Sequence, residues 1–207
     1  MELILAIFVA VIIFWVWKKS RIERDADAQF NLGEMCRKGE GVDQDDETAA
    51  KWCKLSAEQR YAAAQFNLGV MYHEGQGVPQ NDETAAKWHR LSAEQGFADA
   101  QYNLGLMYGE GRGVPQNDET AVKWYRLSAE QGLADAQTNL GVMYHEGRGV
   151  PQNDVYAYMW FNIAASLGNE DAAKNRDFIA KEMTRSQIER AQDLARECLK
   201  KKYKGCD

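Results

Sequence analysis

The chain has 207 residues, of which 45% are hydrophobic and 27% are charged, and its formal net charge is −6. An acidic balance of this kind argues against nucleic acid as a partner. The length leaves room for one elongated domain and a short membrane anchor.

Residues 1–19 are predicted to be an N-terminal membrane anchor. Residues 3–17 are apolar and uncharged, and as a helix rising about 1.5 Å per residue they span about 22 Å, against about 30 Å of hydrocarbon core. Trp15 and Trp17 suit the interface, and the lysines that follow can snorkel. We therefore expect a single transmembrane helix that contacts the membrane through residues 2–17.

A cleaved signal peptide is the alternative interpretation of this segment. It would need positive charge before the apolar run, where Glu2 is the sole charged residue. Four basic residues follow the run, Lys18, Lys19, Arg21 and Arg24. The positive-inside rule therefore predicts that the repeats lie on the cytoplasmic side, with a periplasmic or secreted location as the alternative.

After a linker at residues 20–25, the chain repeats one pattern with a period of 36 residues. All three prolines occupy one position of this pattern, and four of the six tryptophans occupy another. A fixed period of this length is typical of solenoids. The four repeats cover residues 26–61, 62–97, 98–133 and 134–169.

Each repeat is predicted to contain two helices. In the third, apolar spacing predicts one helix over Ala98–Tyr108 and another over about Glu119–Glu130. The glycines and the proline between them stop the first helix, and Asn117 or Asp118 can cap the second. Gly105 lies inside the first helix at a cost of about 1 kcal/mol, which predicts a close approach of the partner helix. Arg60 replaces the closing glycine in the first repeat, which predicts a tighter or irregular turn there.

The shared pattern Ala-Asp-Ala-Gln-x-Asn-Leu-Gly-x-Met-Tyr-x-x-Gly-x-Gly-Val-Pro-Gln-Asn-Asp, followed by Ala-x-x-Trp-x-x-x-Ala, resembles the Sel-one-like repeat family across residues 26–169. These repeats are relatives of the tetratricopeptide repeats. The resemblance implies an all-α fold, a right-handed α-solenoid built as a superhelix of helix-turn-helix repeats, here preceded by the single N-terminal transmembrane helix. It also implies a scaffold or adaptor role, often in bacteria and sometimes in membrane-associated complexes.

The partner surface is expected on the first helix of each repeat, which by the same resemblance lines a concave groove. Positions that vary between copies form one stripe, the rows Phe30/Phe66/Tyr102/Thr138, Glu34/Val70/Leu106/Val142 and Arg37/His73/Gly109/His145. The constant asparagines match the position that holds an extended peptide in tetratricopeptide repeats; hydrogen bonding within the repeat is the alternative. The predicted partner-binding residues are Phe66, Asn67, His73, Tyr102, Asn103, Thr138, Asn139 and His145.

Motifs for chemistry are absent from the sequence, which lacks Ser-x-x-Lys, His-Glu-x-x-His and Cys-x-x-Cys. We therefore expect no enzyme activity, no cofactor and no metal site. The leading hypothesis is a membrane-anchored scaffold that binds a protein or peptide in the groove. The alternatives are a structural or self-assembling spacer and a periplasmic hydrolase of the β-lactamase-like repeat type.

The cysteines Cys36, Cys53, Cys198 and Cys206 do not recur with the repeat period, and free thiols are expected. A Cys36–Cys53 bridge within the first repeat is the alternative, and four cysteines allow three pairings.

Residues 170–207 are predicted to form capping helices and a basic tail. Thr184 to Gln187 reads as a capping box that opens a last helix. The basic run at residues 200–204 is interpreted as a solvated helix end, with contact to anionic lipid as the alternative.

Overall fold

The computed structural model describes residues 25–207, which form ten α-helices and no strand. The chain divides into two compact units, Met1–Asn81 and Asp82–Asp207. The expected all-α helical repeat is therefore confirmed. The predicted anchor at residues 2–17 lies outside the described residues. Among residues 25–207, no helix combines the length and the apolar character needed to cross a bilayer.

Within residues 25–81, the first unit contains three helices of 13 residues each. They are α2 (Ala26–Lys38), α3 (Asp46–Glu58) and α4 (Ala62–Glu74). The carboxylate of Asp25 accepts backbone N–H groups at the start of α2, and that of Asp45 does the same for α3. These caps satisfy N–H groups that have no partner inside the helix.

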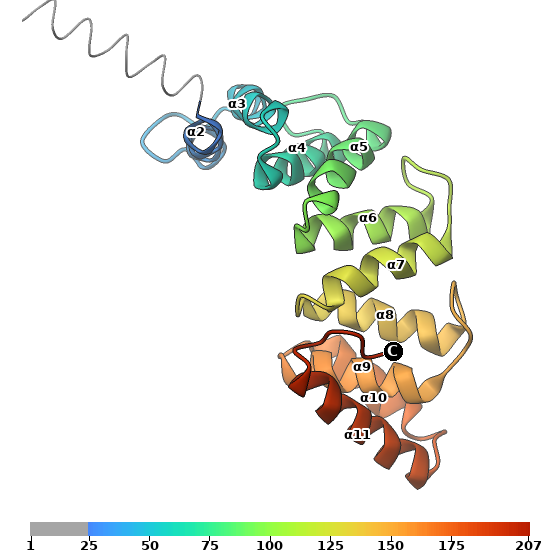
Figure 1. Ribbon diagram of the computed structural model, residues 1–207. Helices are drawn as coiled ribbons and strands as arrows, with labels where there is room; N and C mark the ends of the chain where they lie inside the picture. The colour runs from blue at the N-terminus through green and yellow to red at the C-terminus, as the bar shows by residue number, and fades with distance from the viewer. Residues whose placement is uncertain (1–24) are drawn as a thin grey trace, which may run out of the picture. The chain divides into compact units, whose positions relative to one another are not determined.

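The second unit contains seven helices, and Figure 1 shows α6 beside α7 and α8 beside α9 as antiparallel pairs. They are α5 (Asp82–Glu94), α6 (Ala98–Glu110), α7 (Asp118–Ala129), α8 (Ala134–Glu146), α9 (Asp154–Ser166), α10 (Glu170–Ile179) and α11 (Arg185–Lys200). In the third repeat, α6 and α7 agree with the two predicted helices to within two residues at each end.

The loop between the helices of a repeat depends on two glycines in left-handed backbone. Gly111 ends α6 with φ +70°, and Asn117 caps α7 by accepting the N–H of Thr120 at 2.7 Å. Gly113 has φ +65°, and a β-carbon on it would overlap the carbonyl oxygen of Asp82 at the start of α5. The second glycine of the loop is therefore needed for contact with the preceding repeat.

The interior glycine of the first helix lets the second helix approach closely, as predicted. A β-carbon at Gly105 would lie 2.7 Å from the ring of Tyr125 on α7, and one at Gly141 would lie 2.7 Å from the ring of Phe161 on α9. In the first repeat the smaller Cys53 takes the place of the ring, with Sγ 2.9 Å from such an atom on Gly33.

A buried glutamine in each repeat joins it to the repeat before it. Gln65 donates its side-chain N–H to the carbonyl of Ala57 at 3.0 Å, and Gln101 and Gln137 donate in the same way to Ala93 and Ala129 at 3.1 Å. Each acceptor lies in the last turn of a second helix and also accepts a backbone N–H of the following turn, as Ala93 does from Gly96. The role of this glutamine row was not predicted from the sequence.

The turn at Arg60 differs from the prediction. Arg60 adopts φ 68°, in the same left-handed region as Gly96 at 90° and Gly132 at 89°. The arginine therefore keeps the ordinary turn and accepts the strain of left-handed backbone, about 1–2 kcal/mol for a residue with a side chain.

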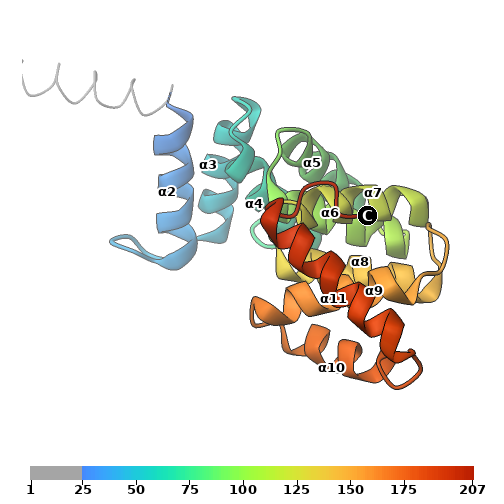
Figure 2. The ribbon, with the colours of Figure 1, turned by 60° about the horizontal axis from the view of Figure 1, so that its bottom comes forward.

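The last two helices cover α9, which carries the largest buried side chains of the second unit. Figures 1 and 2 show α10 and α11 lying against α9. Thr184 and Gln187 form the predicted capping box, and Ala191, Ala195 and Cys198 are buried on the predicted face of α11. The cap thus closes the core with a polar outer surface, as terminal repeats require.

The expectation that all four cysteines are free was wrong for two of them. Cys198 and Cys206 form a disulfide, whereas Cys36 and Cys53 are free and do not bridge. Burial raises the pKa of the Cys53 thiol to about 11, so it is neutral at physiological pH. The basic tail also differs from a solvated helix end, because residues 201–207 fold back onto α7 and α8.

Replacing Gly113 with alanine should destabilise the protein far more than replacing Gly96. Both glycines have positive φ, but a β-carbon at Gly96 meets nothing within 4 Å. We expect Gly96→Ala to cost about 1 kcal/mol in left-handed strain, and Gly113→Ala about 3 kcal/mol because overlap with Asp82 adds to the strain. Urea unfolding followed by circular dichroism measures both. Equal losses would contradict the proposed contact with the preceding repeat.

Candidate functional site

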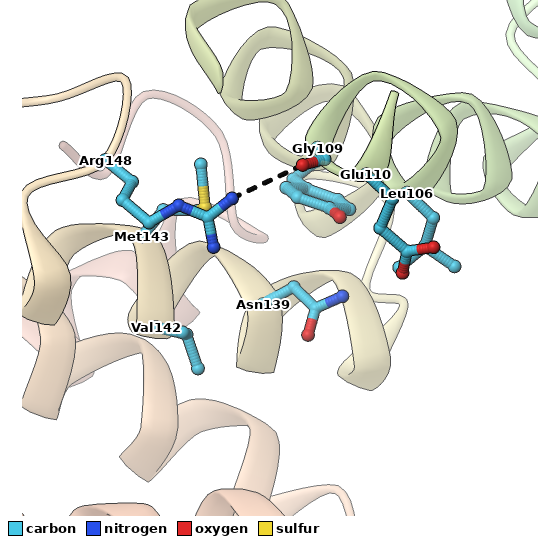
Figure 3. Close-up of a pocket in the computed structure, with 8 residues that line it drawn as sticks. Leu106, Gly109, Glu110, Asn139, Val142, Met143 and Arg148 are labelled. Carbon is cyan, nitrogen blue, oxygen red and sulfur yellow. Dashed lines mark hydrogen bonds between the residues drawn. The ribbon is translucent and has the colours of Figure 1, made fainter. Parts of the chain in front are cut away.

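A hollow of about 200 Å³ lies between α6 and α8 in the second unit (Figure 3). Both helices are first helices of their repeats, so the hollow lies on the stripe predicted for partner binding. Its lining residues are Leu106, Gly109 and Glu110 of α6, Tyr125 of α7, Asn139, Val142 and Met143 of α8, and Arg148 of the following loop.

The hollow exists because one row of the repeats is interrupted. Gly109 occupies the position that Arg37, His73 and His145 fill in the other repeats. The hydroxyl of Tyr125 lies 3.6 Å from the place where a β-carbon of Gly109 would be. The missing side chain therefore leaves open space above Tyr125. Leu106 and Val142, equivalent residues one repeat apart, supply apolar walls.

Arg148 borders one side of the hollow and supplies positive charge there. Its guanidinium donates to the carboxylate of Asp118 at 2.8 Å and to the carbonyl of Gly109 at 3.4 Å, the bond drawn in Figure 3. Hydrogen bonding to Asp118 is the main cause that raises the pKa of Arg148. Glu110 supplies negative charge nearby and pairs with Arg112 at 2.6 Å. Both signs of charge thus border an apolar interior.

Asn139 lies beside two tyrosines of the preceding repeat. Its side chain interacts with the phenols of Tyr102 and Tyr125, whose rings are 6.1 Å apart. Burial raises the pKa of both phenols, so both stay protonated at neutral pH. Asn139 and Tyr102 are therefore two predicted site residues that the fold brings together.

The other asparagines of the row differ in their surroundings. Asn67 donates to the carboxylate of Glu34 at 2.9 Å, and Asn31 donates to that of Asp27 at 3.3 Å. Within the part of the chain that the structure describes, the Asn103 side chain has no hydrogen-bond partner. The Asn31 bond lies inside its own repeat, as the alternative predicts, whereas Asn67 bonds to the preceding repeat. Asn103 is open to a ligand.

The remaining predicted residues do not border the hollow. Thr138 is buried, with 8% of its surface exposed, and its hydroxyl donates to Ala134 within α8. The ring Nδ1 of His145 lies 2.8 Å from the carboxylate of Asp154 at the start of α9. Phe66 and His73 are half-buried on α4 of the first unit, which is described separately.

Four lining residues were missed from the sequence: Glu110, Tyr125, Met143 and Arg148. Met143 belongs to a constant row, which we interpreted as holding the stack, and the row of Glu110 changes only at Lys38. Arg148 is in a loop, and its position depends on Asp118 of the preceding repeat. Among residues 25–207, His, Cys, Asp and Glu side chains nowhere group as metal ligands.

Comparisons with solved structures support the repeat fold. A Sel1 repeat protein from Oxalobacter formigenes is 37% identical, with a TM-score of 0.69 over 72% of this chain and 61% of that one. A protective antigen of uropathogenic Escherichia coli with an SLR fold is 34% identical, with a TM-score of 0.82 over 92% of this chain and 41% of that one. The matched part thus spans less than two thirds of the length of each of these two relatives.

A search of curated proteins found no match. The family model described as Sel1 repeat matches residues 26–61, 62–97, 98–133 and 134–169, the bounds predicted from the 36-residue period. Because these four matches together make up more than half of the chain, it belongs to the Sel1 repeat family.

Proposed function

We propose that this protein is a membrane-anchored scaffold that binds a segment of another protein on the first helices of its third and fourth repeats. Proteins built from Sel1 repeats are typically scaffolds for protein–protein interaction and are generally not catalytic. The membrane anchor at residues 2–17 and the use of this surface are the parts that the proposal adds.

The hollow between α6 and α8 is the observation that carries the proposal. At about 200 Å³ it is smaller than the sites that hold small-molecule ligands, which measure about 300–1,000 Å³. That size suits a single side chain of a partner. Leu106, Val142 and Met143 favour an aliphatic one, since they supply apolar contact.

The polar border suits the backbone of the same segment. An extended peptide presents N–H and C=O groups that need partners when they leave water. The side-chain amides of Asn103 and Asn139 provide donors and acceptors along the stripe. Apolar insertion would then supply affinity, and the amides would fix the direction of the peptide.

Filling the hollow should abolish partner binding. We expect Val142→Arg to reduce crosslinked partners in intact membranes by about tenfold or more, because blocking a buried anchor at an interface costs about 2 kcal/mol or more. Quantitative mass spectrometry of the crosslinked products measures the loss. Asn103→Ala with Tyr102→Ala should weaken the same products.

The control for this experiment is Leu127→Arg. Leu127 is 45% exposed on α7 and lies outside the hollow. The variant therefore places the same arginine outside the hollow, and circular dichroism checks that the protein is folded. Equal capture of partners by the Val142 variant and the wild type would contradict the proposal.

Two observations bear on which side of the membrane the repeats occupy. The four basic residues after the apolar run favour the cytoplasm, which we retain as the proposal. The Cys198–Cys206 disulfide favours the alternative, a periplasmic location, because disulfides persist in oxidising compartments.

The anchor and its orientation predict three results in bacterial cells. The protein should sediment with membranes, and Val11→Arg should release it, because a central charge in a helix disfavours insertion by about 3 kcal/mol. Alkaline phosphatase fused after residue 207 should be inactive. Acid quenching of the cells, followed by alkylation of the denatured protein, should label four cysteines if the repeats face the cytoplasm. An active fusion together with two labelled cysteines would contradict the proposed orientation.

A further inference from the structure

The segment after α11 binds to the second unit through a buried carboxylate. The side chain of Asp207, 1% exposed, accepts hydrogen bonds from the guanidinium of Arg126 on α7 at 2.9 Å and from the hydroxyl of Tyr144 on α8. Arg126 also donates to the Tyr144 hydroxyl at 2.9 Å. Arginine and tyrosine from two adjacent repeats thus enclose one aspartate.

The neighbouring residues of the tail contact the end of α7 and the turn that follows it. The N–H of Gly205 donates to Glu130 at 3.1 Å, and Lys204 lies 3.7 Å from the same carboxylate. The ring of Tyr203 lies against Gly132, within 3.1 Å of where a β-carbon would be. The Cys198–Cys206 disulfide ties this segment to α11. We call Arg126, Glu130, Gly132 and Tyr144 the tail-binding site.

The tail-binding site has a copy one repeat earlier in the chain. Arg90, Glu94, Gly96 and Tyr108 lie 36 residues before its four members, with identical residue types. We call this set the repeat-two site. The first repeat departs from the pattern, since it has Lys54 and Arg60 in place of the arginine and the glycine.

The repeat-two site also has the geometry of the tail-binding site. The guanidinium of Arg90 donates to the hydroxyl of Tyr108 at 2.5 Å, as that of Arg126 does to Tyr144. It also lies 6.0 Å from the centre of the Tyr108 ring. Within the second unit, Arg90 is exposed and no carboxylate pairs with it. The arginine and tyrosine are therefore arranged for a carboxylate that this part of the chain does not supply.

We infer that the repeat-two site binds an aspartate side chain in an extended segment of another protein, a surface separate from the hollow between α6 and α8. The tail bound one repeat away provides the template for this ligand: a lysine three residues before an aspartate, with a glycine between them. Charge-assisted bonds from arginine to carboxylate are the strong class of hydrogen bond. The tail of a second copy is a poor occupant, because Asp207 is buried in its own chain.

A synthetic peptide tests this inference in the full-length protein. The probe is Lys-Tyr-Lys-Gly-Ser-Asp-amide with an N-terminal tetramethylrhodamine label. Serine replaces cysteine, and the C-terminal amide leaves the aspartate as the sole carboxylate of the peptide. Fluorescence anisotropy is recorded with protein up to about 1 mM. We expect saturable binding that weakens about tenfold or more with Arg90→Met or with asparagine in place of the peptide's aspartate, because each change removes a charged hydrogen-bond partner.

Arg126→Met is the matched control, since it makes the same change at the occupied site. The tethered tail competes there at high effective concentration, so this variant should bind the probe as well as the wild type does. Tyr108→Phe, which removes one hydroxyl, should weaken binding with the fold intact by circular dichroism. No saturable binding, or equal binding by Arg90→Met and wild type, would overturn the inference. So would loss confined to Arg126→Met, or self-association by ultracentrifugation that Arg90→Met abolishes, which would identify a second copy as the occupant.

Discussion

A buried glutamine amide, repeated every 36 residues, connects each repeat to the one before it. The amide enters the core, with Gln101 4% exposed, and it adds a hydrogen bond to a helix-end carbonyl that also accepts the N–H of Gly96 in the closing turn. Leaving the amide itself buried and unpaired would cost about 1–3 kcal/mol. Two short helices alone cannot avoid this cost, and they gain stability by lying against a neighbour. The close contacts at Gly105 and Gly113 depend on the same arrangement, since each fixes the distance between helices.

Constant rows hold the helices in place, and departures from the rows create the candidate binding features. Gly109 interrupts a row of larger side chains and opens the hollow above Tyr125. At the tail-binding site, Arg126 and Tyr144 are the same residue types as in the repeat before. They bind Asp207 because the tail after the last repeat folds back onto them. The copy at Arg90 and Tyr108 keeps the same pair without that carboxylate. A repeat array can thus gain distinct sites with small changes to one module, because neighbouring contacts preserve the scaffold.

Much of the fold could be predicted from the sequence, because the signals for helix ends are local. Asn117, Gly111 and the capping box at Thr184 act within a few residues, and the structure confirms them. The site was harder to predict. Asn139 is bound by tyrosines from the preceding repeat, and Thr138 is turned into the core. The Cys198–Cys206 pairing depends on how the tail folds back after α11. These features join residues through tertiary contacts that periodicity does not specify.

The fourth repeat offers the most direct test of the glutamine linkage. In the first and third repeats a second glutamine donates to the buried one at 2.7 Å, Gln59 to Gln29 and Gln131 to Gln101. Leu167 stands at that position in the fourth repeat, and within the described residues the side-chain oxygen of Gln137 is buried without a partner. Leu167→Gln should therefore raise the free energy of unfolding by about 1 kcal/mol, measured by urea denaturation. Leu127→Gln, at an equally exposed leucine, should bring no such gain. An unchanged or lower stability of the Leu167 variant would contradict the account.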